Sequence, residues 1–160
     1  MSTTATRVAG APSRASGFTL IELVVVVALL AIISAIGIPA YGEMVENNRI
    51  VGETNELVSV LSMARIEAVR RHGPVTVCPD GASFSSGVQV KLGSGCSGTP
   101  LTIHKFSHLD SMTVSVANLT FLSTGLAQTE AQFTTKLNDK QRVLCVRQAG
   151  RLESNACSGS

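Results

Sequence analysis

The pattern of hydrophobic and polar residues divides the chain into an apolar stretch, an amphipathic stretch and a series of short alternating segments. Residues 23–42 carry no charge and lie between Glu22 and Glu43. A helix of this length spans about 30 Å, the thickness of one hydrocarbon core, so the pattern predicts a membrane-spanning helix. A carboxylate such as Glu22 costs roughly 2.5 to 3.5 kcal/mol inside a bilayer and therefore marks a functional position.

From Glu43 onward the pattern is that of an amphipathic helix, predicted over residues 43–73. Apolar or small residues recur every three or four positions and form one face that can pack on a sheet. These positions are Ile50, Val51, Thr54, Leu57, Val58, Leu61, Ala64, Arg65 and Ala68. We expect the helix to end near His72, with Gly73 as a left-handed cap and Pro74 as the breaker. Gly37 and Pro39 predict a kink or local loosening earlier in the helix.

Residues 74–160 show the signals of short strands separated by Gly and Ser. Seven strands are predicted, over residues 75–78, 87–92, 101–106, 112–116, 119–122, 131–137 and 142–146. A helix followed by strands predicts an α+β fold, in which one antiparallel β-sheet packs on the apolar face of the helix.

The charge balance argues against strong, sequence-blind binding to polyanions. The chain of 160 residues has a formal net charge of +2, and both excess charges lie before Gly17, at Arg7 and Arg14. A chain that starts at Phe18 has no net side-chain charge, although a local basic patch can persist. Aromatic residues, with no Trp, 1 Tyr and 5 Phe, are too few to supply stacking platforms for single-stranded nucleic acid.

The residues around Glu22 allow two interpretations of the apolar stretch. A secretory signal peptide also has a basic front and an apolar run, but this run is longer and no small-x-small cleavage site follows it. Instead, Gly17-Phe18-Thr19-Leu20-Ile21-Glu22 and the apolar run resemble the class III signal of type IV pilins and pseudopilins. Pro39 and Tyr41 also lie where many pilins carry Pro and Tyr.

The resemblance implies that a prepilin peptidase cuts after Gly17 and methylates Phe18. Residues 1–17 are then a leader peptide, and residues 18–42 remain as the transmembrane and assembly helix. Glu22 becomes an assembly contact that pairs with the terminal amine of a neighbouring subunit, where an unpaired charge would be costly. A simpler interpretation is an acid at a helix N-terminus, favoured by about 0.3 to 1 kcal/mol, and both interpretations can hold.

Over the whole chain, the order of elements is similar to minor pseudopilins of the FimT/GspH type. The resemblance implies a pilin-like fold and a minor subunit of a type IV pilus, incorporated into or at the tip of the filament. The alternative is a GspH-like subunit of a type II secretion system. Implied partners are other pilin subunits, the prepilin peptidase and the bacterial inner membrane, crossed once with the C-terminal domain in the periplasm. After assembly the subunit would lie in a filament or at the cell surface.

Four cysteines in a domain outside the cytoplasm predict disulfides. Three pairings are possible, and we expect Cys78 with Cys96 and Cys145 with Cys157, because each pair closes a Gly/Ser-rich loop beside a strand. Loops of this size stabilise a domain by about 3 kcal/mol each on the chain-entropy account. Zinc is the rival hypothesis, but there is no Cys-x-x-Cys and the spacing is irregular.

A DNA-binding role in uptake and competence is a further hypothesis. FimT-type members implicated in DNA uptake carry a Gly-Arg-x-Arg element, and the aligned residues here are Gly150, Arg151, Leu152 and Glu153. Candidate contacts to double-stranded DNA are Lys140, Arg147 and Arg151. With two or three phosphate contacts we expect weak binding, and a solvated basic loop explains these residues equally well.

No catalytic, metal-binding or cofactor-binding constellation is evident, so we expect neither enzyme activity nor a cofactor. Residues 93–98 match G-x-G-x-x-G, but a strand follows where a dinucleotide fold needs a helix. His104 and His108 are expected on a strand and the turn after it, which does not suit a helical metal site. No Gly-x-Ser-x-Gly context singles out a nucleophile.

Overall fold

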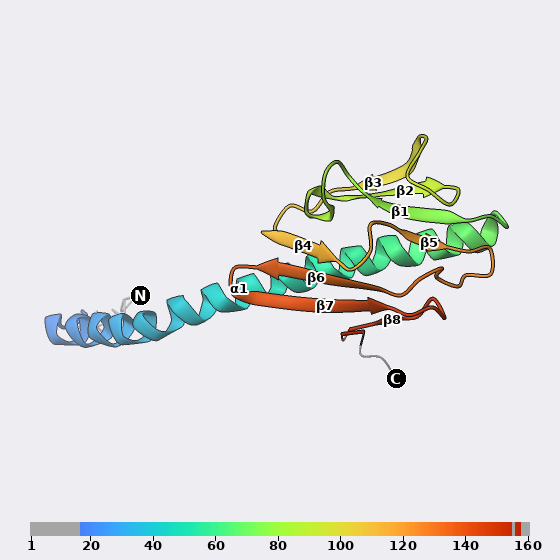
Figure 1. Cartoon of the computed structure of the whole chain (residues 1–160). Helices are drawn as coiled ribbons and strands as arrows, with labels where there is room; N and C mark the ends of the chain where they lie inside the picture. Colours follow the sequence, from blue (N-terminus) through green and yellow to red (C-terminus); the bar gives the residue numbers. More distant parts are fainter. Residues whose placement is uncertain (1–16, 155, 158–160) are drawn as a thin grey trace, which may run out of the picture. The chain divides into compact units, whose positions relative to one another are not determined.

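A computed structural model of the chain describes residues 17–154, 156 and 157, with the backbone alone at residues 36–40. The chain divides into two compact units, Met1–Ala40 and Tyr41–Ser160, called here the N-terminal and C-terminal units. Helix α1, Leu20–Arg70, contributes to both (Figure 1). The predicted leader lies outside the described residues except for Gly17.

Helix α1 is continuous in secondary structure through Gly37 and Pro39. The kink or loosening expected there stays a prediction. In the C-terminal unit the predicted apolar face of α1 is confirmed, because its six main positions are buried. They are Ile50, Thr54, Leu57, Leu61, Ala64 and Ala68.

The C-terminus of α1 differs from the prediction in which residue is left-handed. His72, not Gly73, takes positive φ, at 51°. The Gly73 amide donates to the Ala68 carbonyl at 3.2 Å and the His72 amide donates to Val69 at 3.2 Å, which is the pattern of a Schellman motif. In this motif the left-handed residue directly precedes the residue whose amide makes the longer-range bond, here Gly73. The left-handed residue is therefore His72. Histidine is one of the non-glycine residues that tolerate such a conformation.

All seven predicted strands are present, and their ends shift by no more than about two residues, within the usual uncertainty of boundaries. They are β1 (Val75–Pro79), β2 (Val88–Leu92), β3 (Pro100–His104), β4 (Ser111–Val114), β5 (Leu119–Phe121), β6 (Ala131–Leu137) and β7 (Lys140–Val146). Two short elements were not predicted, the 3-10 helix η1 (Phe84–Ser86) and strand β8 (Leu152–Glu153).

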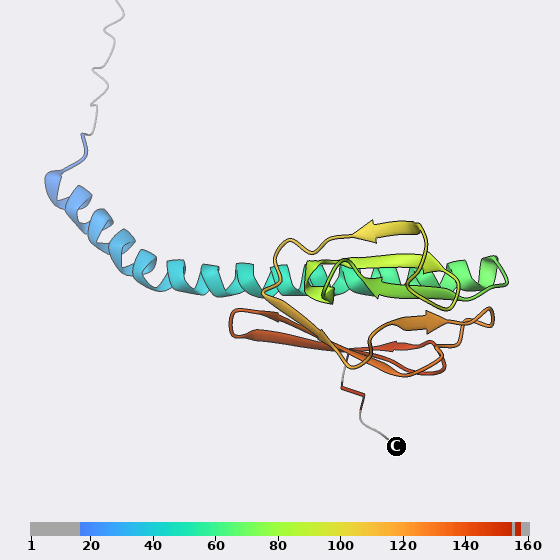
Figure 2. The same ribbon diagram turned by 45° about the horizontal axis from the view of Figure 1, so that its top comes forward.

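The expectation of one sheet is wrong, because the strands form two antiparallel four-stranded sheets. Their orders are β3-β2-β1-β5 and β4-β6-β7-β8. In both views of the C-terminal unit, α1 runs between the β1–β3 group and the β6–β8 group (Figures 1 and 2). The α+β class is as predicted, with the helix covered on two sides instead of one.

A single hydrophobic core joins the two sheets to α1. It includes side chains from the helix, from the first sheet, from the second sheet and from η1. Examples are Leu57 and Leu61 of α1, Val77 of β1, Val90 of β2, Phe121 of β5, Phe133 of β6 and Phe84 of η1. Phe84 and Phe133 meet edge to face at 5.9 Å between ring centroids. Neither sheet has a core of its own, so both depend on the helix.

Two carboxylates of α1 hold the connection between the sheets. Glu53 is buried, and its Oε1 accepts the backbone amides of Ser107 at 3.2 Å and His108 at 2.9 Å. One turn later, Glu56 Oε2 lies 2.9 Å from His104 Nε2 at the end of β3. The chain passes from the first sheet to the second between these contacts, so the helix fixes the crossing.

Two disulfides tie loops to inner strands of the sheets, and they join the pairs expected from the sequence. Cys78 is bonded to Cys96 with 5.8 Å between Cα atoms, and Cys145 is bonded to Cys157 with 5.2 Å. Both distances lie in the range that an unstrained disulfide requires. The first links β1 to the β2–β3 loop, and the second links β7 to the C-terminal segment.

We predict that the protein isolated under non-reducing conditions contains these two bonds. Non-reducing peptide mapping should recover Cys78 joined to Cys96 and Cys145 joined to Cys157, and replacing both Cys145 and Cys157 with Ser should lower the free energy of unfolding by about 3 kcal/mol. Four free thiols, a crossed pairing or stoichiometric zinc would contradict the prediction.

Candidate functional site

The predicted processing site lies outside regular secondary structure, just before α1. Gly17 and Phe18 precede the first helical residue, Leu20, and the Phe18 side chain is 77% exposed. A bond between two residues without regular secondary structure can adopt the extended form that a peptidase needs. The structure places both residues of the predicted cleavage bond in this accessible stretch.

Thr19 caps the start of α1 and contacts the residue predicted for assembly. The Glu22 amide donates to Thr19 Oγ1 at 3.3 Å, and the Leu23 amide donates to the Thr19 carbonyl at 3.2 Å. A Thr at the cap with a Glu three residues later is the sequence pattern of a capping box. The sequence carries this pattern as Thr19-x-x-Glu22, although it was not used to predict the start of the helix. The Glu22 side chain is exposed in the first helical turn, where the helix dipole favours an acid.

The N-terminal unit exposes a large apolar surface. Its large hydrophobic side chains between Leu20 and Ile33 are 43% to 81% exposed. Monomeric proteins rarely leave contiguous apolar surface of this extent in water.

Among the residues that the structure describes, no helix is both long enough and apolar enough to cross a membrane.

The basic loop near the C-terminus brings two of the three predicted DNA contacts together. Arg147 and Arg151 flank the turn between β7 and β8, and the Arg147 amide donates to the Arg151 carbonyl at 2.9 Å. Glu153 bridges them, with Oε2 at 3.1 Å from Arg147 Nε and Oε1 at 2.8 Å from an Arg151 guanidinium nitrogen. Glu130 Oε2 lies 3.6 Å from Arg147. These two arginines and two carboxylates have no net charge.

The two arginines stabilise the ionised form of Glu153. The hydrogen bond from Arg147, followed by the charges of Arg147 and Arg151, holds the pKa of Glu153 below its ordinary value. In return, the hydrogen bond to Glu153 raises the pKa of Arg147. The residue that stands in place of the second arginine of Gly-Arg-x-Arg therefore pairs with both other arginines and, together with Glu130, balances their charge.

Lys140 does not join this pair. It is the first residue of β7, and Arg147 directly follows the last. Seven steps along a strand separate the two residues by about 23 Å. The hypothesis that Lys140 could share the patch is therefore not supported by the geometry, and Lys140 lies instead beside Asn47 and Asp139 in a separate hollow.

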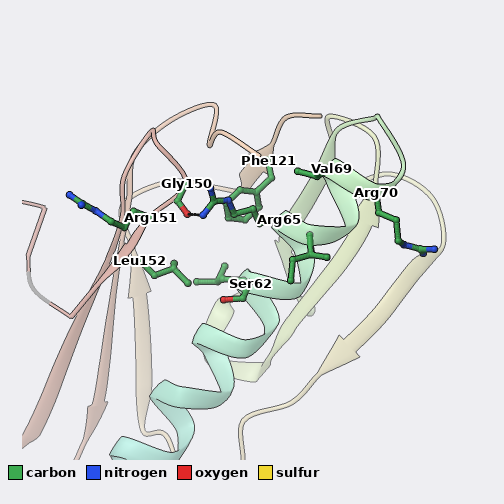
Figure 3. A pocket seen from close by; sticks show the side chains of 10 residues that line it. Ser62, Arg65, Val69, Arg70, Phe121, Gly150, Arg151 and Leu152 are labelled. Carbon is green, nitrogen blue, oxygen red and sulfur yellow. Dashed lines mark hydrogen bonds between the residues drawn. The ribbon is translucent and has the colours of Figure 1, made fainter. Parts of the chain in front are cut away.

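Arg65 of α1 holds the basic loop in place. Its guanidinium donates to the carbonyls of Gly150 at 2.7 Å and Ala149 at 3.4 Å (Figure 3). Gly150 has φ of +72°, and a Cβ there would come within 2.2 Å of the Gly125 carbonyl oxygen and 2.8 Å of Arg65 Nε. Only glycine fits this position, so the glycine of the Gly-Arg pair serves the loop geometry.

Beside this loop lies an apolar groove with a cavity volume of about 540 Å³, called here the α1 groove. Its walls are the last turns of α1, Phe121 of β5 and the β7–β8 turn (Figure 3). The lining residues are Leu61, Ser62, Arg65, Ile66, Val69, Arg70, Phe121, Gly150, Arg151 and Leu152. The groove was not predicted from the sequence, because the segments that form its walls are far apart along the chain.

The His104 side chain pairs with Glu56 as described above, while His72 and His108 are exposed. Among the described residues, no three His, Cys, Asp or Glu side chains are grouped so that they could hold a metal ion. The structure therefore offers two surfaces for function in the C-terminal unit, the basic loop and the α1 groove, and one exposed apolar helix in the N-terminal unit.

Comparisons with known proteins agree with this architecture. Residues 53–150, more than half of the chain, match the family described as type II transport protein GspH. Residues 12–38 match the prokaryotic N-terminal methylation motif. Prepilin peptidase-dependent protein D of Escherichia coli strain K12 is 37% identical over 67 residues, which are 42% of this chain and 45% of that protein. The matched region thus spans less than half the length of this curated relative.

Two crystal structures of the type IV minor pilin FimU from Pseudomonas aeruginosa strain PAO1 have a similar fold. Both are 29% identical to this chain and 91% covered. The form in space group P65 gives a TM-score of 0.56 over 66% of this chain, and the form in P21 gives 0.59 over 69%. The predicted pilin-like fold class is confirmed, and the family consists of structural subunits and not of known enzymes. The chain belongs to the GspH family of minor pilins and pseudopilins, whose members serve type IV pili or type II secretion.

Proposed function

We propose that the chain is a minor subunit of a type IV pilus. One N-terminal helix anchors it in the bacterial inner membrane until it is incorporated into the filament or located at the filament tip. The observation that carries the proposal is the methylation motif at residues 12–38, joined to an apolar helix whose side chains are exposed in the single chain. Lipid covers such a surface before assembly, and neighbouring subunits cover it afterwards. The C-terminal unit, with its two disulfides, then lies in the oxidising periplasm.

In this proposal Glu22 has a partner only after assembly. Cleavage after Gly17 leaves a cationic amine on Phe18, and the exposed Glu22 carboxylate lies one helical turn away. In an apolar filament interior, an unpaired carboxylate or amine is costly, so a Glu22 of one subunit and a terminal amine of another stabilise each other. The capping contact with Thr19 uses the Glu22 amide and leaves its carboxylate available.

A type II secretion pseudopilus is the second candidate, and the match to the type II transport family favours it. The similarity to the minor pilin FimU favours the pilus. The two assignments share the processing site and Glu22, and they differ in the filament that contains the mature subunit.

The first prediction of this proposal concerns processing. Intact-mass analysis of protein extracted from membranes should show Phe18, methylated, as the first residue, because the motif directs cleavage after Gly17. A mature chain that begins after residue 35 would instead identify an ordinary secretory signal peptide. An uncleaved chain would also contradict the proposal.

The second prediction concerns assembly. Replacing Glu22 with Ala should leave the subunit in the membrane but reduce its amount in sheared pili by at least about tenfold, since one buried amine then lacks its partner. Arg49→Ala, which removes an exposed charge from the same helix outside both proposed contacts, is the matched control. Normal incorporation of the Glu22→Ala subunit would reject the pairing, and absence of the unmodified subunit from sheared pili would favour the secretion system.

We further propose that any contact with double-stranded DNA is made by Arg147 and Arg151 and is weak. Glu153 pairs with both arginines, so phosphate must compete with a carboxylate already in place. Two phosphate contacts give a log-log salt slope of only about −2, near −0.9 for each contact.

The third prediction follows from this competition. Titration of labelled duplex DNA into the full chain in detergent at physiological salt should give weak or undetectable binding. Glu153→Arg should strengthen binding and steepen the salt slope by about one unit, and Arg151→Ala should weaken it. Glu153→Gln is the control that releases the arginines without adding a cation. Tight binding by the natural chain that survives Arg151→Ala would place the DNA site elsewhere.

A further inference from the structure

The α1 groove lies in an apolar surface that nothing in the C-terminal unit covers among the residues described. Ile66 is 64% exposed and Val69 is 44% exposed on the same face of α1, three residues apart. The turn after β5 adds Leu122, 38% exposed, and Leu126, 45% exposed. This turn lies against α1 at Gly125, because a Cβ built there would be 3.1 Å from Val69 Cγ2. The groove is thus the centre of a wider apolar patch.

The groove carries positive charge at its edges. Its lining contains Arg65, Arg70 and Arg151 and no carboxylate, although Glu153 next to the groove pairs with Arg151. The positive charge of the groove therefore comes mainly from Arg65, whose hydrogen bonds are to carbonyls, and from the helix end at Arg70. Arg70 and Arg151 point outward on opposite sides of the groove (Figure 3). At the helix end Glu67 pairs with both Arg70 and Arg71, which lowers the pKa of Glu67 to about 2 through hydrogen bonds from these arginines. One carboxylate therefore faces two arginines there, and the edge keeps a positive excess.

These charges disfavour a symmetric pairing of two grooves. Such a contact would bring together two linings that contain arginines and no carboxylate, and like-charge contact is costly at an interface. The occupant must present apolar side chains together with carboxylates.

The opposite end of α1 in the C-terminal unit has this chemistry. Tyr41 is 69% exposed and Met44 is 61% exposed, three residues apart on one helical face. Glu43 is exposed and Glu46 half-buried, and residues 41–46 contain no basic residue. The Glu46 carboxylate already accepts a hydrogen bond from Asn138 Nδ2 at 2.8 Å, so Glu43 is the carboxylate most open to a partner.

We propose that two copies of this chain associate head to tail, with residues 41–46 of one copy seated in the α1 groove of the next. Tyr41 and Met44 fill the apolar floor, and Glu43 meets the arginines at the edge. Aromatic, Met and Arg side chains are the residue types that interfaces of this kind favour. The two surfaces are centred about 22 residues apart on one helix. Their separation along the helix axis is therefore about 33 Å.

Such a contact is heterologous, and it leaves a free groove at one end and a free segment at the other. Contacts of this type extend into open assemblies when the rotation between copies does not close a ring. The inference agrees with a role in a filament but does not depend on it, because it rests only on surfaces of the C-terminal unit.

Photocrosslinking of the full chain in detergent tests the contact. Benzoylphenylalanine replaces Ile66, which is exposed, in an equal mixture of ordinary and nitrogen-15-labelled copies. After irradiation, mass spectrometry should find mixed-isotope cross-links from position 66 to residues 41–46. The control places the same probe at Leu101, 39% exposed on β3, which should give no link to residues 41–46. Links from position 66 to another groove, to other residues, or within one copy only would overturn the proposal.

A charge reversal provides the second arm. Glu43→Arg should lower the yield of this cross-link by about tenfold, because one attraction becomes a repulsion at the same place. Higher salt should also lower the yield for the position-66 probe chain that keeps Glu43. A yield that neither change affects would overturn the proposal. Because cleavage after Gly17 is measured independently by intact mass, failure of this contact leaves the pilin assignment standing.

Discussion

The fold depends on the burial of one face of α1 between two sheets. Leu57, Leu61, Ala64 and Ala68 are fully buried, and they belong to the same core as Val77 of the first sheet and Phe133 of the second. Burying a side chain of the size of Leu contributes about 1.5 to 3 kcal/mol, and no other element brings as many such positions into contact with both sheets. The same helix continues into the N-terminal unit, where its apolar side chains are exposed. One element thus serves folding with one part and, in the proposed function, assembly with the other.

The sequence predicted the elements far better than their partners. Alternation of apolar and polar residues identifies a strand and the face that it buries, and for this reason β6 was predicted with its observed bounds. Pairing between strands is set by long-range packing that a single sequence does not display, so the split into two sheets was missed. Strand β8 has only 2 residues, too few for any periodic pattern. At the helix end, composition identified the stop but not that His72 would take the left-handed conformation.

The candidate sites show the same limit. Local motifs mark Phe18 and Glu22, and an even count marks the cysteines. Such signals can be recognised from the sequence alone. The relation of Lys140 to Arg147 depends on how far β7 extends, and a strand of 7 residues is long enough to separate them. The substitution of Glu153 in the Gly-Arg-x-Arg element was visible in the sequence. Its bridging of Arg147 and Arg151 requires the register of β7 with β8, in which Cys145 lies opposite Glu153.

The two candidate surfaces of the C-terminal unit share one turn, and this sharing constrains what the subunit can do. Arg151 lines the α1 groove and also belongs to the basic loop, while Gly150 and Arg65 fix the position of both. A partner seated in the groove brings a carboxylate near Arg151, which already faces Glu153. Phosphate and the partner would therefore compete for the same guanidinium. Within an assembly only the subunit at the end with a free groove would keep Arg151 accessible, so any DNA contact through this loop belongs to that terminal position.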